Sequence, residues 1–319
     1  MIVSRVSHSE VESYLLCRRK HWYGYGMSLQ PKVTASALTM GTAGHCVLEE
    51  FYAYLLSQGG TNAEQLAAFE DGLIVAEAVY QKLVNEGYED DPKKALLHDT
   101  LFTWYFPNEP MVKQGWTVLS VEDEFVLEYD NVSNPDDPKQ YPFKIDVVMR
   151  DPNGKVVVVD HKFVGEFTSY EDSELQPQIP KYIGALRALN HQIHYGAYNQ
   201  LRTRKIVGTK SKAHPNGIGP TLDQALLFMP IKPSGTRVAQ VFNEQIAVAD
   251  EIQYRKTLPL DTQNALSFRV ANKMVCRMCN FKDLCTAELT GGNSKLLIQT
   301  EYQVRERKQF ALEATEDAE

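Results

Sequence analysis

The stretch Pro142–Lys162, which reads PFKIDVVMRDPNGKVVVVDHK, decides the expected fold. Two apolar runs rich in β-branched residues, 143–149 and 156–159, flank the turn sequence Asp-Pro-Asn-Gly at 151–154. Apolar strands separated by such a turn predict a β-hairpin. We therefore expect these residues to form two antiparallel strands in the core of an α/β protein.

Three charged residues of this hairpin are candidates for chemistry. Asp146 lies inside the first run and Asp160 ends the second, where an uncompensated carboxylate is costly. Lys162 follows Asp160 by two residues, so both side chains share one face of the strand. Two carboxylates and an ammonium that converge at strand ends suit a divalent metal ion and an activated water. The alternative is a surface ion pair of Asp160 and Lys162, which contributes little to stability.

Composition and charge set the class of protein. The 319 residues allow one large domain or two modest ones, and 43% hydrophobic with 23% charged residues is ordinary for a globular chain. A net charge of −8 argues against a uniformly basic surface but leaves room for a local basic groove. No run is long enough to span a bilayer and the N-terminus lacks a signal-peptide pattern, so we expect a cytoplasmic protein that does not bind membranes.

Further segments supply candidate residues. A helix expected from Gly41 to about residue 57 carries His45, and its glycines would allow a backbone or ligand to come close. A lone His on such a helix is more often a hydrogen-bonded core residue than a ligand. A helix expected over 173–189 places Gln178 and Tyr182 one turn apart.

The remaining elements complete the expected layout. Residues 61–105 predict two or three helices, which we interpret as an inserted helical cap. Strands are expected at 116–129, 193–204 and 223–231, a long helix at 234–256, and polar loops at 130–139 and 209–221.

A basic run follows the first helix. Arg18, Arg19 and Lys20 precede the aromatic residues Trp22 and Tyr23. The run predicts either a solvated helix end, where cations are favoured by the helix dipole, or a phosphate-contacting patch with stacking aromatics. Taken alone, the residues favour the solvated helix end.

The cysteines form a specific pattern. Cys276, Cys279 and Cys285 have C-x2-C-x5-C spacing and supply three thiolates, whereas a zinc ion or iron–sulfur cluster needs a fourth. Cys46 is expected to be a small buried hydrophobe in its helix. Cys17 lies beside basic residues that favour a thiolate, so we predict that it is the fourth ligand.

Taken in order, these motifs resemble a known family. Gly41-x-x-x-His45, Asp146, Asp160-x-Lys162, Gln178-x-x-x-Tyr182 and the cysteine layout together resemble the RecB-like branch of the PD-(D/E)XK nucleases. They are most similar to the iron–sulfur exonucleases of the CRISPR-associated type and their phage relatives, over residues 7–285. The resemblance implies a mixed central β-sheet flanked by helices, the restriction-endonuclease-like core, with a helical insertion and an iron–sulfur cluster joining the chain ends.

The resemblance also implies roles for individual residues. Mg²⁺ or Mn²⁺ would be held by His45, Asp146, Asp160 and the backbone carbonyl of His161, and Lys162 would orient or deprotonate the attacking water. Gln178 and Tyr182 would hold the substrate strand or the lysine. A [4Fe-4S] cluster, with Zn²⁺ as the alternative, would be bound by Cys17, Cys276, Cys279 and Cys285. The expected DNA contacts are Arg18, Arg19, Lys20 and Tyr182.

The expected function is therefore a Mg²⁺/Mn²⁺-dependent DNA exonuclease. Its substrate would be single-stranded or frayed DNA ends in recombination, replication or repair, with proteins of replication or recombination as possible partners. The alternative is a non-catalytic nucleic-acid-binding or adaptor protein on the same fold. The segments expected are 1–30 with the first cysteine, 31–115 with the Gly-x-x-x-His motif, 116–260 as the nuclease core, 261–300 with the cysteine cluster, and 301–319 as an acidic tail.

Overall fold

A computed structural model describes residues 5–32, 36–87, 91–130, 138–205, 221–270 and 272–305. The chain divides into two compact units, the first made of 1–8 and 35–253 and the second of 9–34 and 254–319. Most of the three segments expected to be polar loops or an acidic tail (130–139, 209–221 and 301–319) lies outside the described residues.

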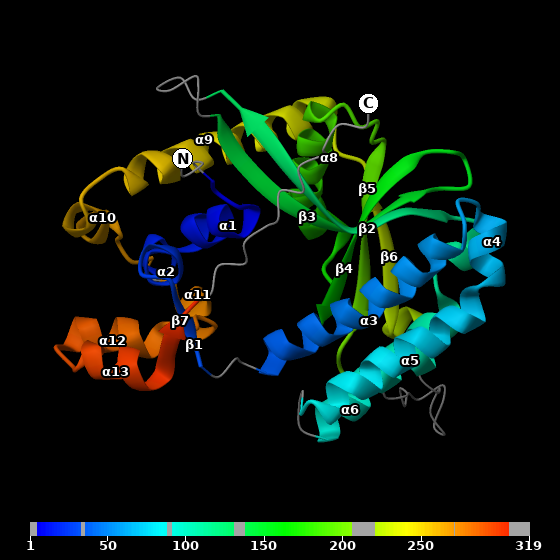
Figure 1. Ribbon diagram of the computed structural model, residues 1–319, viewed down its shortest axis with the longest axis horizontal. Coiled ribbons are helices and arrows are strands. Elements are labelled where there is room, and N and C mark those ends of the chain that lie inside the picture. The colour runs from blue at the N-terminus through cyan, green and yellow to red at the C-terminus, as the bar shows by residue number, and fades with distance from the viewer. Residues whose placement is uncertain are drawn as a thin grey trace, which may run out of the picture. The chain divides into compact units, whose positions relative to one another are not determined.

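The first unit is built on a five-stranded sheet with the order β2-β3-β4-β5-β6. Only β4 and β5 are parallel, and every other neighbouring pair is antiparallel, so the sheet is mixed as expected. The predicted hairpin is confirmed as β3 and β4 (Figure 1). The strands are β2 Thr117–Tyr129, β3 Lys139–Arg150, β4 Val156–Val164, β5 Tyr195–Arg202 and β6 Leu226–Ile231.

The sheet opens between the two strands of this hairpin. β3 and β4 pair only where 147–150 meets 156–159. Beyond that point β3 continues to pair with β2, whereas β4 continues with β5. Asp146 and Asp160 are the first residues past the paired segment on their strands. We call this opening the fork, and it places the two predicted carboxylates side by side.

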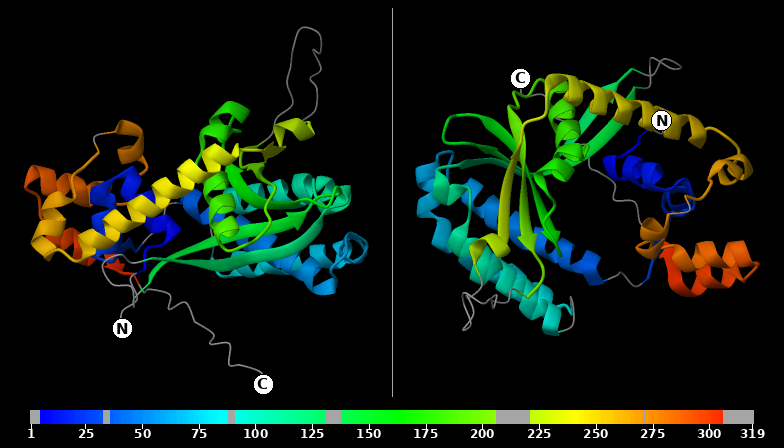
Figure 2. Two further views of the ribbon diagram at one scale, coloured as in Figure 1. Left: turned by 90° about the horizontal axis from the view of Figure 1, so that it is seen from above. Right: turned by 180° about the vertical axis from the view of Figure 1, so that it is seen from behind.

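Helices cover both faces of the sheet (Figure 2). Val157 and Val159 belong to the apolar cluster that the sheet shares with α3 and α5. Val158 points to the other face, where it lies with Ile179 of α8 (Gln178–Ala188) around Gly196. The elements on the α3 face are α3 Ser36–Gln58, α4 Asn62–Ala67, α5 Phe69–Asn85, α6 Asp91–His98, a π-helical segment Asp99–Tyr105 and 3-10 turns Phe106–Asn108 and Val112–Gln114.

The helices over 62–105 are not an inserted cap. Phe69, Leu101 and Tyr105 are buried in the same cluster as Val147 and Val157 of the sheet. An amphipathic helix must bury its apolar stripe, and the face of the sheet supplies the surface. These helices are therefore a layer of the core of the first unit itself.

The helix that carries His45 begins earlier than expected. α3 starts at Ser36 rather than Gly41, so both glycines of the motif lie inside the helix. A Cβ atom built on Gly44 would lie 2.2 Å from the ring of Phe163 on β4, whereas one on Gly41 would meet nothing within 4 Å. The close approach that Gly44 permits is therefore that of a side chain from the sheet.

Gly44→Ala is expected to destabilise the protein by about 1–3 kcal/mol, because the added methyl group overpacks the contact between α3 and Phe163. Gly41→Ala is the matched control, since its methyl group points into open space and alanine favours a helix by about 0.5–1 kcal/mol over glycine. Urea denaturation of both variants measures the difference. Equal stabilities would contradict the packing role of Gly44.

The single helix expected over 173–189 is two helices, α7 Tyr170–Leu175 and α8 Gln178–Ala188. The break lies at Gln176, which is extended, because the residue before Pro177 disfavours helical backbone. Gln178 is thus the first residue of α8. Helix α9, Gly235–Lys256, packs on α8 where Gly184 leaves room for Phe242.

The second unit joins segments from both ends of the chain. Strands β1 Leu29–Pro31 and β7 Tyr302–Val304 pair antiparallel, and Trp22, Tyr23 and Leu29 share a cluster with Phe281, Leu284 and Tyr302. Its helices are α1 His8–Leu16, α2 Arg18–His21, a π-helical turn Trp22–Gly26, α10 Leu260–Leu266, α11 Lys273–Arg277, α12 Lys282–Thr290 and α13 Ser294–Glu301. Throughout the described chain, no helix combines the length and apolar character that crossing a membrane requires.

Candidate active site

Three side chains converge at the fork on a site suited to a metal ion. His45 of α3, Glu122 of β2 and Asp146 of β3 place one ligand atom each within 4.8 Å of one another. His45 Nδ1 lies 3.5 Å from Asp146 Oδ2. Carboxylate oxygens are the ligands that Mg²⁺ and Mn²⁺ prefer, and an imidazole favours Mn²⁺ somewhat. The donor set therefore fits the predicted ions.

Glu122 was not predicted as a ligand. The sequence presents it as the first of three consecutive acids, 122–124, on an expected strand, with nothing to single it out. Its backbone is left-handed, with φ of 52°, and follows a register shift in β2 between Val118 and Ser120. A left-handed non-glycine residue costs on the order of 1–3 kcal/mol and is common at functional sites. In the register of β2 and β3, Glu122 stands opposite Asp146, since its neighbours Val121 and Asp123 pair with Val147 and Ile145.

Burial shifts the pKa values of several groups of the site. Burial raises the pKa of Asp146 to about 7, although the backbone N–H of His161 donates to Oδ2 at 2.8 Å. Burial and the charge of Asp146 raise the pKa of Asp160 to about 6. Burial also lowers the pKa of His45, which keeps its imidazole neutral and able to coordinate. A bound cation would offset the cost of these buried carboxylates.

The other predicted residues form a hydrogen-bonded chain beside this group. Lys162 Nζ lies 2.8 Å from Asp160 Oδ2 and donates to Gln178 Oε1 at 2.7 Å. Gln178 Nε2 donates to Asp160 Oδ1 at 2.6 Å and to the Tyr182 hydroxyl at 3.1 Å. Asp160, Lys162, Gln178 and Tyr182 are therefore brought together, with the Gln178 amide linking the other three.

His161 points to the opposite face of β4, as the alternation of a strand requires. Its Nδ1 lies 2.9 Å from Asn199 Nδ2, and its ring stacks on Tyr52 with centroids 5.6 Å apart. Burial lowers its pKa to about 3, so the imidazole is uncharged. The side chain is outside the metal-binding group, and only its backbone lies with Asp146.

The cysteines divide between the two units. Cys46 belongs to α3 of the first unit, whereas Cys17, Cys276, Cys279 and Cys285 all belong to the second. Of these four cysteines, all described, no three place their sulfur atoms within 4.8 Å of one another. Four sulfurs on one tetrahedral zinc would be about 3.8 Å apart, given Zn–S bonds of about 2.3 Å. The structure thus shows neither a formed zinc site nor a formed cluster among the described cysteines.

The two arginines of the basic run make contacts with other residues of the second unit. Arg19 is only 9% exposed, and its guanidinium donates to Glu288 and, at 2.5 Å, to Asn264 Oδ1. Arg18 lies over the rings of Tyr14 and Phe268. These contacts show a role in packing for both arginines, and the DNA contacts of Arg18, Arg19 and Lys20 stay predictions.

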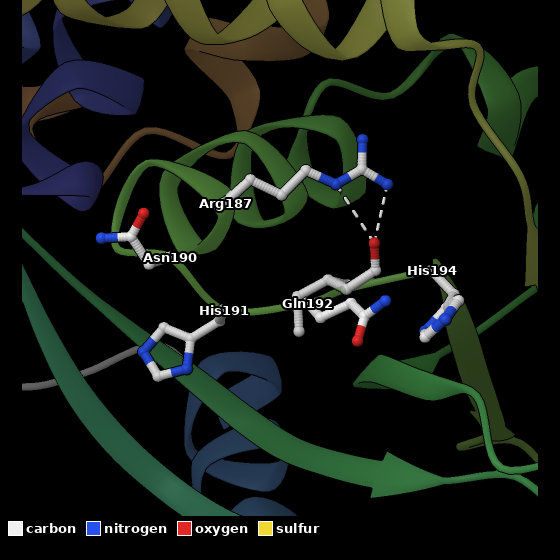
Figure 3. Close-up of a pocket in the computed structure, with 6 residues that line it drawn as sticks. Arg187, Asn190, His191, Gln192 and His194 are labelled. Atoms are coloured by element: carbon white, nitrogen blue, oxygen red, sulfur yellow. Dashed lines mark hydrogen bonds between the residues drawn. The ribbon is translucent and has the colours of Figure 1, made fainter.

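A separate hollow of about 490 Å³ surrounds the C-terminal end of α8 (Figure 3). It is lined by Arg187 and residues 190–194, and Arg187 donates through Nε and Nη2 to the Ile193 carbonyl at 3.1 and 2.7 Å. None of the predicted catalytic residues lines it. The hollow is therefore distinct from the candidate active site.

Comparison with known proteins identifies similarity at the level of a superfamily. The family model described as the PD-(D/E)XK nuclease superfamily matches residues 5–286. A search of curated proteins finds no match. Among solved structures, the one titled "Crystal structure of SSO0001" is 13% identical, covers 66% of this chain and 78% of its own, and has a TM-score of 0.32.

Proposed function

Because this chain belongs to the PD-(D/E)XK nuclease superfamily, we propose that it is a metal-dependent deoxyribonuclease that hydrolyses phosphodiester bonds. The observation that supports this most is the convergence of His45, Glu122 and Asp146 at the fork, beside Asp160 and Lys162. Removing the carboxylates or the lysine should therefore abolish cleavage.

The ion-binding residues follow from the donor set. His45, Glu122 and Asp146 would hold the ion, and Asp160 with the carbonyl of His161 would complete its shell as the resemblance implies. When bound, such an ion lowers the pKa of a coordinated water and neutralises charge on the phosphodiester. A divalent cation would also favour the charged forms of Asp146 and Asp160, whose pKa values burial raises.

Lys162 would act on the attacking water and the developing negative charge. Its ammonium is held by Asp160 and Gln178 and is not one of the groups that converge for the ion. Gln178 fixes the lysine and Asp160 at once, and Tyr182 fixes Gln178 in turn. An ammonium preorganised in this way can stabilise a transition state without reorganising during the reaction.

We further propose that the substrate is single-stranded or frayed DNA ends and that cleavage is exonucleolytic, as the resemblance implies. The alternative is a non-catalytic DNA-binding or adaptor protein on this fold. The presence of Asp146, Asp160 and Lys162 in one connected site favours the nuclease.

Digestion of labelled DNA tests the function. Linear DNA labelled at either the 5′ or the 3′ end, in single- and double-stranded form, is incubated with Mn²⁺ or Mg²⁺, with covalently closed circular DNA as the substrate that has no ends. We expect linear DNA to be degraded from one end, the circle to survive, and Asp160→Asn to be inactive. Degradation of the circle would exclude a purely exonucleolytic enzyme. Binding without cleavage in either ion would favour the adaptor.

We also propose that the second unit holds a [4Fe-4S] cluster on Cys17, Cys276, Cys279 and Cys285. The placement of all four in one unit, with Cys279 and Cys285 against its aromatic cluster, supports the proposal. Arg269 Nε lies 3.1 Å from Cys285 Sγ, so a guanidinium stands beside one of the proposed ligands. To bind a single zinc ion instead, the four thiols would have to move closer together.

Cys17→Ser is expected to lose iron and the brown colour and to lower the melting temperature, because the cluster would tie both ends of the chain together and a link between distant positions stabilises a fold strongly. Cys46→Ser is the matched control and should keep its iron, since Cys46 lies in the other unit. Measuring the iron content and the melting temperature of both variants decides which of the two cysteines is a cluster ligand. Loss of iron in Cys46→Ser alone would show that the fourth ligand is wrong.

A further inference from the structure

Lys144 forms an ion pair with one carboxylate of the candidate metal centre. It lies on β3 two residues before Asp146, and its Nζ is 2.5 Å from Glu122 Oε2. Glu122 is the same residue that converges with His45 and Asp146. The lysine side chain is 44% exposed, whereas Glu122 is 13% exposed, so an ammonium on a partly solvated side chain contacts a largely buried acid.

A second carboxylate lies within reach of the same ammonium. Glu49 Oε1 is 3.9 Å from Lys144 Nζ. Glu49 follows His45 by one turn of α3, and its side chain is 38% exposed. The Lys144 ammonium therefore has two carboxylate partners within reach. Glu122 belongs to the metal-binding group, whereas Glu49 lies just outside it and is more exposed to solvent.

We propose that Lys144 is a tethered cation that competes with the divalent ion for Glu122, and that it moves to Glu49 when the ion is bound. This inference rests on the proposed metal centre and names a residue that sets its ion affinity. Lys144 acts through Glu122, so it is a positioning residue.

The competition follows from charge and burial. Without an ion, Glu122 and Asp146 face each other in the register of the two strands, and the Lys144 ammonium is the cation that contacts Glu122. A divalent ion on Glu122 and an ammonium at hydrogen-bonding distance from the same carboxylate would repel each other strongly in a poorly solvated site. The ion therefore binds at the cost of the contact between Lys144 and Glu122.

Calorimetric titration of the full-length protein with Mn²⁺, without DNA, tests the proposal. Lys144→Met is expected to bind Mn²⁺ on the order of 10-fold more tightly than the wild type, whereas Lys144→Arg should stay close to it because the guanidinium keeps the charge. Lys155→Met is the matched control: Lys155 is an exposed lysine on the turn between β3 and β4, and its loss changes the net charge equally. It should alter the affinity far less.

Thermal melts supply a second readout of the same competition. Ion-free Lys144→Met should melt at a lower temperature than the wild type, because Glu122 loses its compensating charge, and saturating Mn²⁺ should remove the difference. A residue with only a packing role would lower the melting temperature under both conditions. That outcome would overturn the proposal.

A double-mutant cycle tests the proposed move of Lys144 to Glu49. Glu49→Gln should weaken Mn²⁺ binding in the wild type, because Lys144 then has no alternative to Glu122, and should weaken it less in Lys144→Met. Equal losses in both backgrounds would refute the move to Glu49. Unchanged or weaker binding in Lys144→Met would overturn the competition alone, whereas absence of Mn²⁺ binding to the wild type would overturn the metal centre as well.

Discussion

Lys162→Met is expected to lower the rate of DNA hydrolysis by on the order of 100-fold or more while leaving Mn²⁺ and DNA affinity close to those of the wild type. The ammonium is positioned by Asp160 and Gln178 at 2.8 and 2.7 Å, yet it supplies no ligand atom to an ion. Methionine keeps the length of the side chain and removes the charge. The substitution should therefore slow the chemical step and leave the binding of the ion and of DNA unchanged.

Single-turnover cleavage of labelled DNA, with calorimetry for Mn²⁺ and a filter-binding assay for DNA, separates these effects. Gln178→Ala should lose a smaller share of the rate, because the lysine keeps its contact with Asp160. Wild-type turnover in Lys162→Met would remove the lysine from the mechanism. A loss of Mn²⁺ affinity that accounted for the whole defect would instead make its role one of ion binding.

The positions of the candidate residues of the hairpin relative to one another could be predicted because strand geometry is nearly independent of the rest of the fold. The turn at 151–154 determines the register of β3 against β4, which places Asp146 and Asp160 at equivalent positions. The two-residue period then puts Lys162 on the face of Asp160. The same local logic placed Gln178 and Tyr182 one turn apart, although the helix was expected to start before the break that Pro177 imposes.

Other features depended on contacts that no local pattern encodes. Glu122 is a candidate ligand because the register of β2 after its shift places it opposite Asp146, and α3 brings His45 to the same place. The helices over 62–105 look like an insertion in the sequence, yet their apolar stripe completes the core. Gly44 is needed because Phe163, more than a hundred residues later, occupies the space where its side chain would be.

Asp146→Asn is expected to abolish cleavage by removing a charged ligand from the ion site. The amide has nearly the shape of the carboxylate and can still accept the hydrogen bond from the His161 backbone N–H, so the fold should be kept. Loss of a carboxylate from this group should weaken Mn²⁺ binding by on the order of 100-fold, as calorimetry would measure. Wild-type Mn²⁺ affinity in this variant would show that Asp146 is not a ligand.

The same substitution is expected to stabilise the ion-free protein at pH 8. The pKa of Asp146 is about 7 in the fold against 3.8 for an ordinary Asp, so between these values the folded state binds more protons than the unfolded state. Asp146 should therefore make the stability of the ion-free wild type fall, relative to that of the variant, as the pH rises from about 4 to 7. The cost at pH 8 is at most about 4 kcal/mol, and less in practice because the side chain is partly solvated.

Melting curves from pH 5 to 8 in a chelator, with and without excess Mn²⁺, measure both effects. The ion-free stability of the wild type should fall relative to that of Asp146→Asn across this range, since Asp160 and His161, whose pKa values also depart from the ordinary ones, are present in both proteins. Saturating Mn²⁺ should stabilise the wild type more than the variant at pH 8, because the wild type binds the ion on the order of 100-fold more tightly. A wild type whose ion-free stability did not fall relative to that of Asp146→Asn between pH 5 and 7 would contradict the raised pKa of Asp146, because His161, whose lowered pKa acts in the opposite direction, is present in both proteins.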